Sequence, residues 1–471
     1  MTKTGKRIIF TLCLSALTVV GIAQTYKVKP TVNWNNMTGQ MTADHWSIND
    51  IAPARPYRRT LANNKPFTEY YKQVHPGIIR IMHTEILWYD ADGKKYDREI
   101  IKTDMDSIMK QYAPNGELIT DRIMLCIYDI PKWIGTANLF ADAKSWGLTE
   151  AQEDEAAAFI AQLPVIMKEL GYPVKMYEVF NEKMRGGVRS PFDKDYWRLV
   201  RKIIIKLKEA APDIQVGGTA EAWTYNYAFT GFIDYVSDVA DFISFHNYYG
   251  TGDGGKNRNR LTVNGTLYDH GVEADAGSVA AYVKKQGGNI RLETHQSEYQ
   301  IVSDSIGDCP RRDHVGASWI AIYLKRFALN GLTGAMMWYT NEIPAFPNSA
   351  TGKLFLWSRY LRGGIAESSG TGDTVELLPV LAPDGGKSVL LINRKDQKTT
   401  VADVRSLFGG KASKINGMRL DETTRVSPAG GGYTNSFRSP VYRIDTLQSV
   451  PKDVVLNSYG MVLLTDKELK Y

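Results

Sequence analysis

The stretch Val174-Lys-Met-Tyr-Glu-Val-Phe-Asn-Glu182 is a short apolar and aromatic run that ends in an amide followed by a carboxylate. This pattern predicts a buried strand with Asn181 and Glu182 at its carboxyl end. Helical periodicity precedes the run at residues 149–170 and follows it at residues 196–210. Helix, buried strand and helix in succession indicate a parallel sheet, in which the carboxyl ends of the strands face the active site. The sequence therefore places Glu182 where chemistry occurs.

The same alternation of apolar runs and helical segments extends over much of the chain. Strand-like runs, most of them apolar, predict eight strands, at residues 45–51, 77–83, 123–128, 174–182, 214–218, 241–246, 290–299 and 334–338. Each run except the last is followed by a segment with helical periodicity, and the region is close to the usual length of about 250 residues plus insertions. The chain is therefore predicted to be an α/β protein whose main part is a (β/α)8 TIM barrel.

The composition changes after Arg362, where helical periodicity stops. Short β-rich runs follow, separated by glycine-containing turns, at residues 374–380, 389–393, 399–404, 441–446 and 461–465. They predict an antiparallel β-sandwich. We therefore expect a barrel at residues 24–360 and a sandwich domain at residues 361–471. Because no Pro/Ser-rich linker separates the two, the sandwich should be docked on the barrel.

Residues 1–23 have the three parts of a secretory signal peptide: a basic start, the apolar run Ile8 to Ile22, and small residues before a cleavage site. The mature chain is expected to begin at or near Gln24. Cys13 lacks the small residues expected just before a lipid-modified cysteine, so a soluble product is predicted. The protein should be exported, to the periplasm or the extracellular space.

The overall composition is that of an ordinary globular protein, with 43% hydrophobic and 23% charged residues. The formal net charge of +6 is small and scattered, so nucleic acid is not an expected partner. After export, no membrane span is expected, and we predict a monomer. Only Cys126 and Cys309 would remain after cleavage, and they do not indicate a disulfide framework.

A second carboxylate follows in the predicted strand at residues 290–299. Glycoside hydrolysis needs two carboxyl groups on opposite sides of the anomeric carbon, one protonated and one ionised. Glu298 is the favoured partner of Glu182, because it lies where the strand gives way to a loop. Glu293 is the alternative, because alternation along the strand would turn Glu293 and His295 into the barrel.

Three other motifs were weighed against this interpretation. Gly250 to Gly255 matches the dinucleotide-binding glycine pattern, but no apolar helix follows it. His83 with Glu85, and Glu293 with His295, are not accompanied by a helical H-E-x-x-H or by cysteine ligands. A G-x-S-x-G nucleophile elbow is absent from the sequence. Neither a metal nor another cofactor is therefore expected.

The motifs resemble the retaining glycoside hydrolases of clan A, whose barrels carry the acid/base at the end of strand four and the nucleophile at the end of strand seven. The chain is most similar to families 30 and 39, and more distantly to the agarase and porphyranase family 86. The resemblance covers about residues 45–340. Its pieces are Glu178-Val-Phe-Asn-Glu182, Gln296-Ser-Glu-Tyr299, Val216-Gly-Gly218, Ile243-Ser-Phe-His-Asn-Tyr248 and Met337-Trp338.

The resemblance implies roles for the residues around the two carboxylates. Asn181 would hydrogen-bond the sugar 2-hydroxyl, Arg80 and Tyr248 would hold the nucleophile ionised and oriented, and Trp338 would form the floor of the pocket. His246, and Glu293 if it is not the nucleophile, are further candidates for binding substrate. Structural alternatives stay open: an ion pair for Arg80, core hydrogen bonds for His246 and Tyr248, and packing for Trp338.

The predicted function is that of a secreted retaining glycoside hydrolase acting on a polysaccharide or oligosaccharide through two carboxylates, about 5–5.5 Å apart. The alternative is a barrel that binds carbohydrate without cleaving it. An intact carboxylate pair favours the enzyme, because a protein that only binds sugar has no need for Glu182 beside Asn181 and for Glu298 after Ser297.

Overall fold

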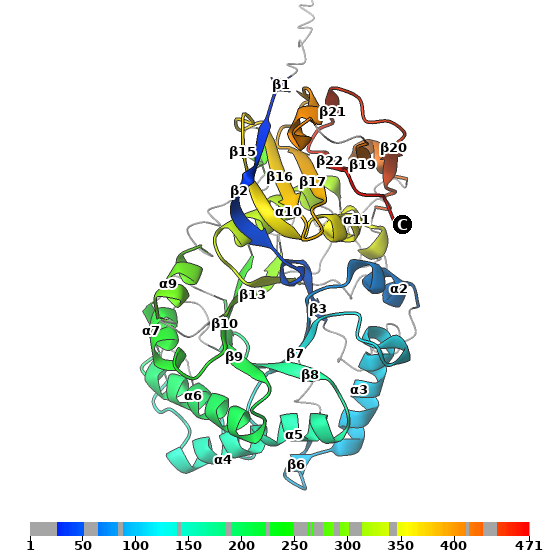
Figure 1. The fold of residues 1–471 in the computed structure, drawn as a ribbon. Helices are drawn as coiled ribbons and strands as arrows, with labels where there is room; N and C mark the ends of the chain where they lie inside the picture. Colours follow the sequence, from blue (N-terminus) through cyan, green and yellow to red (C-terminus); the bar gives the residue numbers. More distant parts are fainter. Residues whose placement is uncertain are drawn as a thin grey trace, which may run out of the picture.

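Eight parallel strands close into a barrel in which each strand lies beside the next one along the chain (Figure 1). We number them one to eight: β3 (Ser47–Asp50), β4 (Ile78–Ile81), β7 (Arg122–Ile127), β8 (Val174–Val179), β9 (Gln215–Glu221), β10 (Phe242–Tyr248), β13 (Glu293–Gln300) and β14 (Gly334–Met337). The predicted TIM barrel is confirmed. Strand four is β8 and strand seven is β13, as the motif order required.

The computed structural model describes residues 26–50, 65–82, 88–138, 143–183, 190–222, 227–248, 262–263, 265–267, 277–286, 293–300, 313–338, 346–410, 414–426 and 440–470. The predicted signal peptide, Cys309 and the Gly250 to Gly255 motif lie outside these residues. Among the described residues, no helix is both long and apolar enough to cross a membrane.

Side chains along the barrel strands alternate between the interior and the surrounding helices. In β4, Ile79 and Ile81 belong to the main hydrophobic core outside the barrel, whereas Ile78 belongs to a separate cluster. That second cluster is a buried apolar layer within the barrel, made of Ile78, Met124, Met176, Phe242 and Met336. Because both faces of the strands are covered, strands such as β7 and β14 consist of nearly continuous apolar runs.

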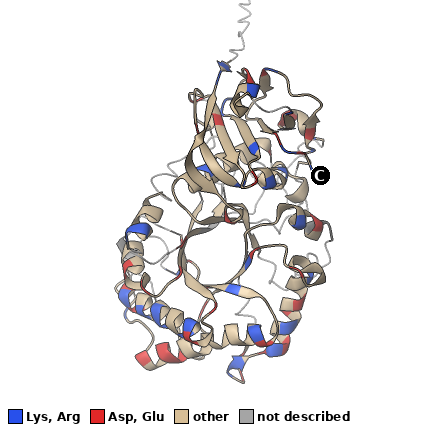
Figure 2. Ribbon diagram, viewed as in Figure 1, with Lys and Arg blue, Asp and Glu red and all other residues tan. Residues whose placement is uncertain are grey.

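Helices cover the outside of the barrel: α2 (Lys65–Val74), α3 (Arg98–Tyr112), α4 (Glu150–Ile160), α5 (Gln162–Glu169), α6 (Asp193–Ala210), α7 (Tyr227–Val236), α9 (Ser278–Gln286), α10 (His314–Leu329) and α11 (Ala350–Leu356). Basic and acidic residues are interspersed along the outer helices (Figure 2). Some of these charges join neighbouring helices, because Arg198 and Lys202 of α6 form ion pairs with the buried Glu153 of α4.

The sandwich consists of two sheets. The larger sheet has the order β2-β15-β16-β17-β22-β19-β20 and the smaller one β1-β18-β21. The bounds are β1 (Tyr26–Val28), β2 (Thr31–Met41), β15 (Gly363–Ser369), β16 (Val375–Leu381), β17 (Lys387–Asn393), β18 (Thr399–Val401), β19 (Asn416–Leu420), β20 (Asp445–Leu447), β21 (Val454–Leu456) and β22 (Met461–Thr465). Apolar side chains of both sheets form a common core, which includes Leu377, Leu391, Val401 and Leu456.

The larger sheet buries its second face against the barrel. Leu378, Leu390 and Leu463 belong to the same hydrophobic cluster as Trp319 and Phe327 of α10. In addition, Lys325 of α10 pairs with Glu376 of β16, and both side chains are almost fully buried. The expectation that the sandwich is docked rather than tethered is confirmed by this shared core.

One expectation about the domain boundary needs correction. Residues 26–41 were assigned to the barrel, but β2 pairs with β15 and β1 pairs with β18, so these residues complete the two sandwich sheets. The chain enters the barrel only after β2, through the 3-10 helix η1 (Ala43–Trp46). The sandwich is therefore built from both ends of the described chain.

The remaining elements are short. Two hairpins lie outside the main sheets, β5 (Tyr89–Asp90) with β6 (Lys95–Tyr96), and β11 (Thr262–Val263) with β12 (Thr266–Leu267). The described residues also form the 3-10 helices η3 (Pro114–Gly116), η7 (Phe346–Asn348), η8 (Trp357–Tyr360), η9 (Val404–Phe408) and η10 (Glu422–Thr424).

Candidate active site

Glu182 lies in a sharp turn just after strand four. The backbone of Phe180 and of Glu182 takes positive φ angles, 70° and 53°, which side-chain-bearing residues rarely adopt. Neighbouring strands stabilise this turn: the N–H of Phe180 donates to the carbonyl of Ile127 (2.8 Å), and that of Glu182 donates to the carbonyl of Ala220 (3.1 Å). Strained backbone of this kind is concentrated at functional sites.

The carboxyl group of Glu182 contacts a buried histidine. Its Oε1 lies 2.8 Å from Nδ1 of His246, on strand six. The Glu182 side chain is 23% exposed, whereas that of His246 is fully buried. A partly exposed carboxyl group with one oxygen held by an imidazole and with access to solvent can exchange a proton with a bound ligand.

Arg80 lies inside the barrel at the centre of a buried polar network. It donates to Glu178 Oε2 through Nε (2.6 Å), to Asn49 Oδ1 through Nη1 (3.0 Å) and to Asn181 Oδ1 through Nη2 (2.6 Å). Arg80 and Glu178 are both fully buried, and each compensates the other's charge. Arg80 therefore forms the structural ion pair that the sequence analysis left open. The same guanidinium also contacts the candidate site, because it donates to Asn181.

The Arg80 contact fixes the orientation of the Asn181 amide. Because Oδ1 of Asn181 accepts from Arg80, its Nδ2 group remains as the donor that a ligand can use. The side chain is only 5% exposed, so it has little freedom to turn. Asn181 is therefore prepared to donate a hydrogen bond to a hydroxyl oxygen beside Glu182.

A β-bulge determines which register Glu298 occupies in strand seven. The ladder with β10 pairs Phe245 with Gln296 and then His246 with Glu298, so Ser297 is an extra residue. A one-residue bulge changes the face on which later residues stand. Glu298 thus shares the register of His246, while the next residue, Tyr299, is buried in the outer core against Phe327 of α10. The Glu298 side chain itself lies outside the described residues.

Trp338 follows strand eight and is 7% exposed. Its backbone N–H donates to the carbonyl of Tyr299 (3.0 Å). Its side chain clusters with Met82 and Cys126, and Tyr128 packs alongside. These residues stand at or near the carboxyl ends of strands two, three and eight. Trp338 thus belongs to an apolar cluster at the carboxyl ends of these strands, and its role as a pocket floor stays a prediction. The backbone of Tyr248 ends strand six, and its side chain lies outside the described residues.

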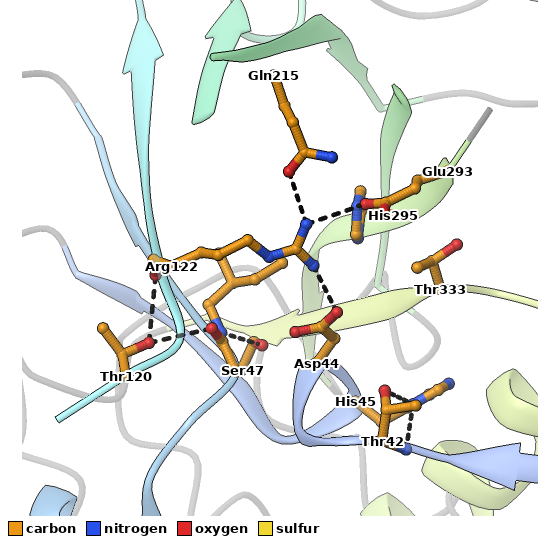
Figure 3. Close-up of polar contacts among 12 residues, drawn as sticks. Thr42, Asp44, His45, Ser47, Thr120, Arg122, Gln215, Glu293, His295 and Thr333 are labelled. Atoms are coloured by element: carbon orange, nitrogen blue, oxygen red, sulfur yellow. Dashed lines mark hydrogen bonds and ion pairs between the residues drawn. The ribbon is translucent and has the colours of Figure 1, made fainter. Parts of the chain in front are cut away.

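Glu293 lies at the other end of the barrel, as the first residue of strand seven. Its carboxylate contacts Nη1 of Arg122 (3.2 Å) and Nε2 of His295 (2.9 Å). The same Arg122 contacts Gln215 and Asp44, so these side chains form a polar cluster at the amino ends of the strands (Figure 3). The structure does not bring Glu293 to Glu182. Residues at this end of a TIM barrel serve stability rather than catalysis.

The cluster in Figure 3 leads to a prediction about pH and stability. Burial alone would raise the pKa of Glu293, but His295 and then Arg122 outweigh it and hold that pKa at about 2. Since the folded-state pKa is lowered, the ionised group stabilises the fold above its unfolded pKa, and this contribution is lost as the pH falls towards 2. We expect Glu293→Gln to lower the free energy of unfolding at pH 7 by on the order of 2–3 kcal/mol.

Denaturant unfolding at pH 7 and at pH 3 measures this effect, and the difference between wild type and variant should be smaller at pH 3. The control is Glu169→Gln, which removes an exposed ion pair with Arg98 and should change stability by less than about 1 kcal/mol. If Glu293→Gln and Glu169→Gln lost the same free energy of unfolding, the stabilising role of the Glu293 carboxylate would be contradicted.

Two residues of this region were not among the sequence candidates. Glu178 was not a candidate in its own right, yet a carboxylate inside a buried strand is itself a signal that a buried cation compensates it. Asn49, the further partner of Arg80, gave no such signal, because its strand was the least regular in the sequence. Among the described residues, no group of three or more His, Cys, Asp and Glu side chains could hold a metal ion.

No protein-family model matches the sequence, and no curated protein sequence does. Solved structures do share the fold. A monomeric β-xylosidase from Caulobacter crescentus superposes with a TM-score of 0.60 at 16% identity, over 94% of this chain and 99% of its own. A GH39 enzyme from Xanthomonas axonopodis pv. citri matches with a TM-score of 0.60 at 13% identity, over 95% and 99%.

BuGH86, solved in complex with neoagarooctaose, matches with a TM-score of 0.63 at 14% identity, over 93% of this chain and 78% of its own. A GH30 endoxylanase from Clostridium papyrosolvens is a further match. The resemblance to families 30, 39 and 86 is therefore confirmed at the level of the fold, since identities this low establish no more. The matches span nearly the whole chain, so the likeness includes the sandwich as well as the barrel.

Proposed function

We propose that the chain is an exported retaining glycoside hydrolase that cleaves O-glycosidic bonds of a polysaccharide or oligosaccharide. The observation that carries the proposal is the position of the two glutamates. Glu182 follows strand four beside Asn181, and Glu298 stands near the carboxyl end of strand seven in the register of His246. The fold is one that several solved glycoside hydrolases share. Two carboxyl groups at these strand ends can flank the anomeric carbon of a bound sugar.

In the first step, ionised Glu298 attacks the anomeric carbon while protonated Glu182 donates its proton to the departing glycosidic oxygen. The bond from carbon to that oxygen breaks, and an ester bond to Glu298 forms. In the second step, Glu182 takes a proton from water, whose oxygen displaces Glu298. Two inversions at one carbon give a product of unchanged anomeric configuration.

The neighbouring residues would support these steps. Asn181, with its amide nitrogen left to donate, would bind the sugar 2-hydroxyl, a contact that strengthens in the transition state. His246 would hold Glu182 in place through both steps, since its Nδ1 already contacts Glu182 Oε1. The predicted signal peptide supports export. Export fits a polymeric substrate, because an exported enzyme acts on glycans outside the cytoplasm.

A panel of aryl glycosides and of plant, algal and host glycans, assayed for reducing sugar, tests the proposal. Xylans and agars belong in it, because the solved neighbours include an endoxylanase and a complex with neoagarooctaose. We expect cleavage of at least one substrate, and NMR of the first-formed product should show the anomer of the starting bond. An inverted first product would contradict the mechanism. Binding without cleavage of any glycan would favour the carbohydrate-binding alternative.

A further inference from the structure

The sandwich contacts the barrel at the connections that follow strands six, seven and eight. These connections leave the carboxyl ends of β10, β13 and β14, which is the end of the barrel where Glu182 lies. Their described parts are the β11–β12 hairpin, the start of α10 at His314, and the 3-10 helix η7. Each of them is hydrogen-bonded to a residue of the sandwich.

The β11–β12 hairpin is held by the sandwich turn that follows β17. The N–H of Leu267 donates to the carbonyl of Arg394 (2.6 Å), and Nη2 of Arg394 donates back to the carbonyl of Leu267 (2.8 Å). Nζ of Lys395 donates to Oγ1 of Thr266 (2.8 Å). The Leu267 side chain is fully buried in the main core. The hairpin is thus joined to the sandwich by backbone, side-chain and apolar contacts together.

The tip of this hairpin favours glycine. Gly265 has a φ of +70°, and a Cβ added there would lie 2.6 Å from Oδ2 of Asp396. The N–H of Asp396 also donates to the carbonyl of Gly265 (2.9 Å). A side chain at residue 265 would therefore have to adopt a left-handed backbone conformation and displace the Asp396 carboxylate.

Tyr442 of the sandwich contacts both of the other connections. It is 2% exposed. Its N–H donates to the carbonyl of Asn348 in η7 (2.8 Å), and its hydroxyl accepts from the N–H of His314 (3.3 Å). Tyr459 of the sandwich connects the turn at Lys395 to α10: its backbone N–H donates to the carbonyl of Lys395 (3.0 Å), and its carbonyl accepts from the hydroxyl of Ser318 (2.6 Å).

We infer that the sandwich is a positioning part of the active site, because it fixes the hairpin after strand six and the ends of the connections after strands seven and eight. The inference rests on the proposed function for its catalytic consequence. Sugars bound beyond the two that flank the cleaved bond contact such connections, whereas a small aryl glycoside needs only the central residues. The substrate class that depends on the sandwich is therefore a polymer or long oligosaccharide.

Two variants of the full-length chain test the inference, Gly265→Ala at the hairpin and Tyr442→Phe, which keeps the ring and removes only the hydroxyl. Asp384→Asn is the control, since it removes an exposed ion pair with Lys467 within the sandwich. Hydrogen exchange at the amides of Leu267 and Asp396 should become faster by about tenfold in Gly265→Ala, while β16 and β17 exchange as before. In Tyr442→Phe, hydrogen exchange should become faster at the His314 amide, which loses its acceptor.

For catalysis, we expect both variants to raise KM for the polymer by about threefold to tenfold and to leave kcat/KM for an aryl glycoside within about twofold. The inference would be overturned if the amides of Leu267 and Asp396 exchanged no faster in Gly265→Ala than in the wild type. It would also be overturned if the variants lost kcat/KM equally on the polymer and on the aryl glycoside. If no glycan is cleaved by the wild type, the proposed function fails, and the exchange measurements still decide whether the sandwich positions these segments.

Discussion

Glu298→Gln is expected to lower kcat by about 10³-fold or more on every substrate that the wild type cleaves. The amide has nearly the same shape as the carboxylate but cannot form the ester bond to the anomeric carbon. Substrate binding should survive, because the neutral side chain still fills the space. The measurement is kcat from initial rates, with binding of the same glycan followed by calorimetry.

Glu293→Gln is the matched control for this experiment. Glu293 begins the same strand, and it contacts Arg122 and His295 at the amino ends of the barrel strands. We expect this variant to lose stability but to keep its activity at a temperature where it is folded. Full activity of Glu298→Gln beside an inactive, folded Glu293→Gln would show that the nucleophile had been assigned to the wrong residue.

Periodicity predicted the barrel and the place of Glu182 well, for a physical reason. Strands such as β7 and β8 are buried on both faces and form largely apolar runs, so they are easily recognised between amphipathic helices. The end of such a run marks the carboxyl end of a strand. Asn181 and Glu182 follow β8 after one intervening residue, Phe180, so their position at the mouth of the barrel could be predicted without knowing any contact.

The same periodicity could not decide between Glu293 and Glu298. Strict alternation places residues 293 and 298 on opposite faces, and the sequence gives no sign of the extra residue at Ser297. The bulge depends on hydrogen bonding with both neighbouring strands, since the ladder with β14 shifts in the same region. Register of this kind is set by tertiary contacts and not by local pattern.

The sandwich shows a second limit of local pattern. β2 has the alternation of an ordinary strand, but its partner β15 begins more than 300 residues later, and nothing within residues 31–41 identifies that partner. The domain assignment of residues 26–41 was wrong for this reason. Conversely, the near-continuous burial of β16 and β17 reflects the barrel on one side and the second sheet on the other.

Glu182→Ala is expected to separate the two chemical steps. Without the acid, glycosides with poor leaving groups should react about 10³-fold more slowly, because the departing oxygen is no longer protonated. An aryl glycoside with a strongly acidic phenol needs little protonation, so its first step should proceed almost as in the wild type. The second step lacks its base, so the glycosyl ester on Glu298 should accumulate.

Intact-protein mass spectrometry after mixing with the activated aryl glycoside should therefore detect one added sugar residue on Glu182→Ala. Azide, which needs no deprotonation, should restore turnover and give a glycosyl azide of the same anomeric configuration as the substrate. Asn181→Ala is the comparison, because it removes the neighbouring amide but leaves both carboxyl groups, and no ester should accumulate in it. Equal loss of rate on activated and unactivated substrates would indicate that Glu182 binds the sugar without transferring a proton.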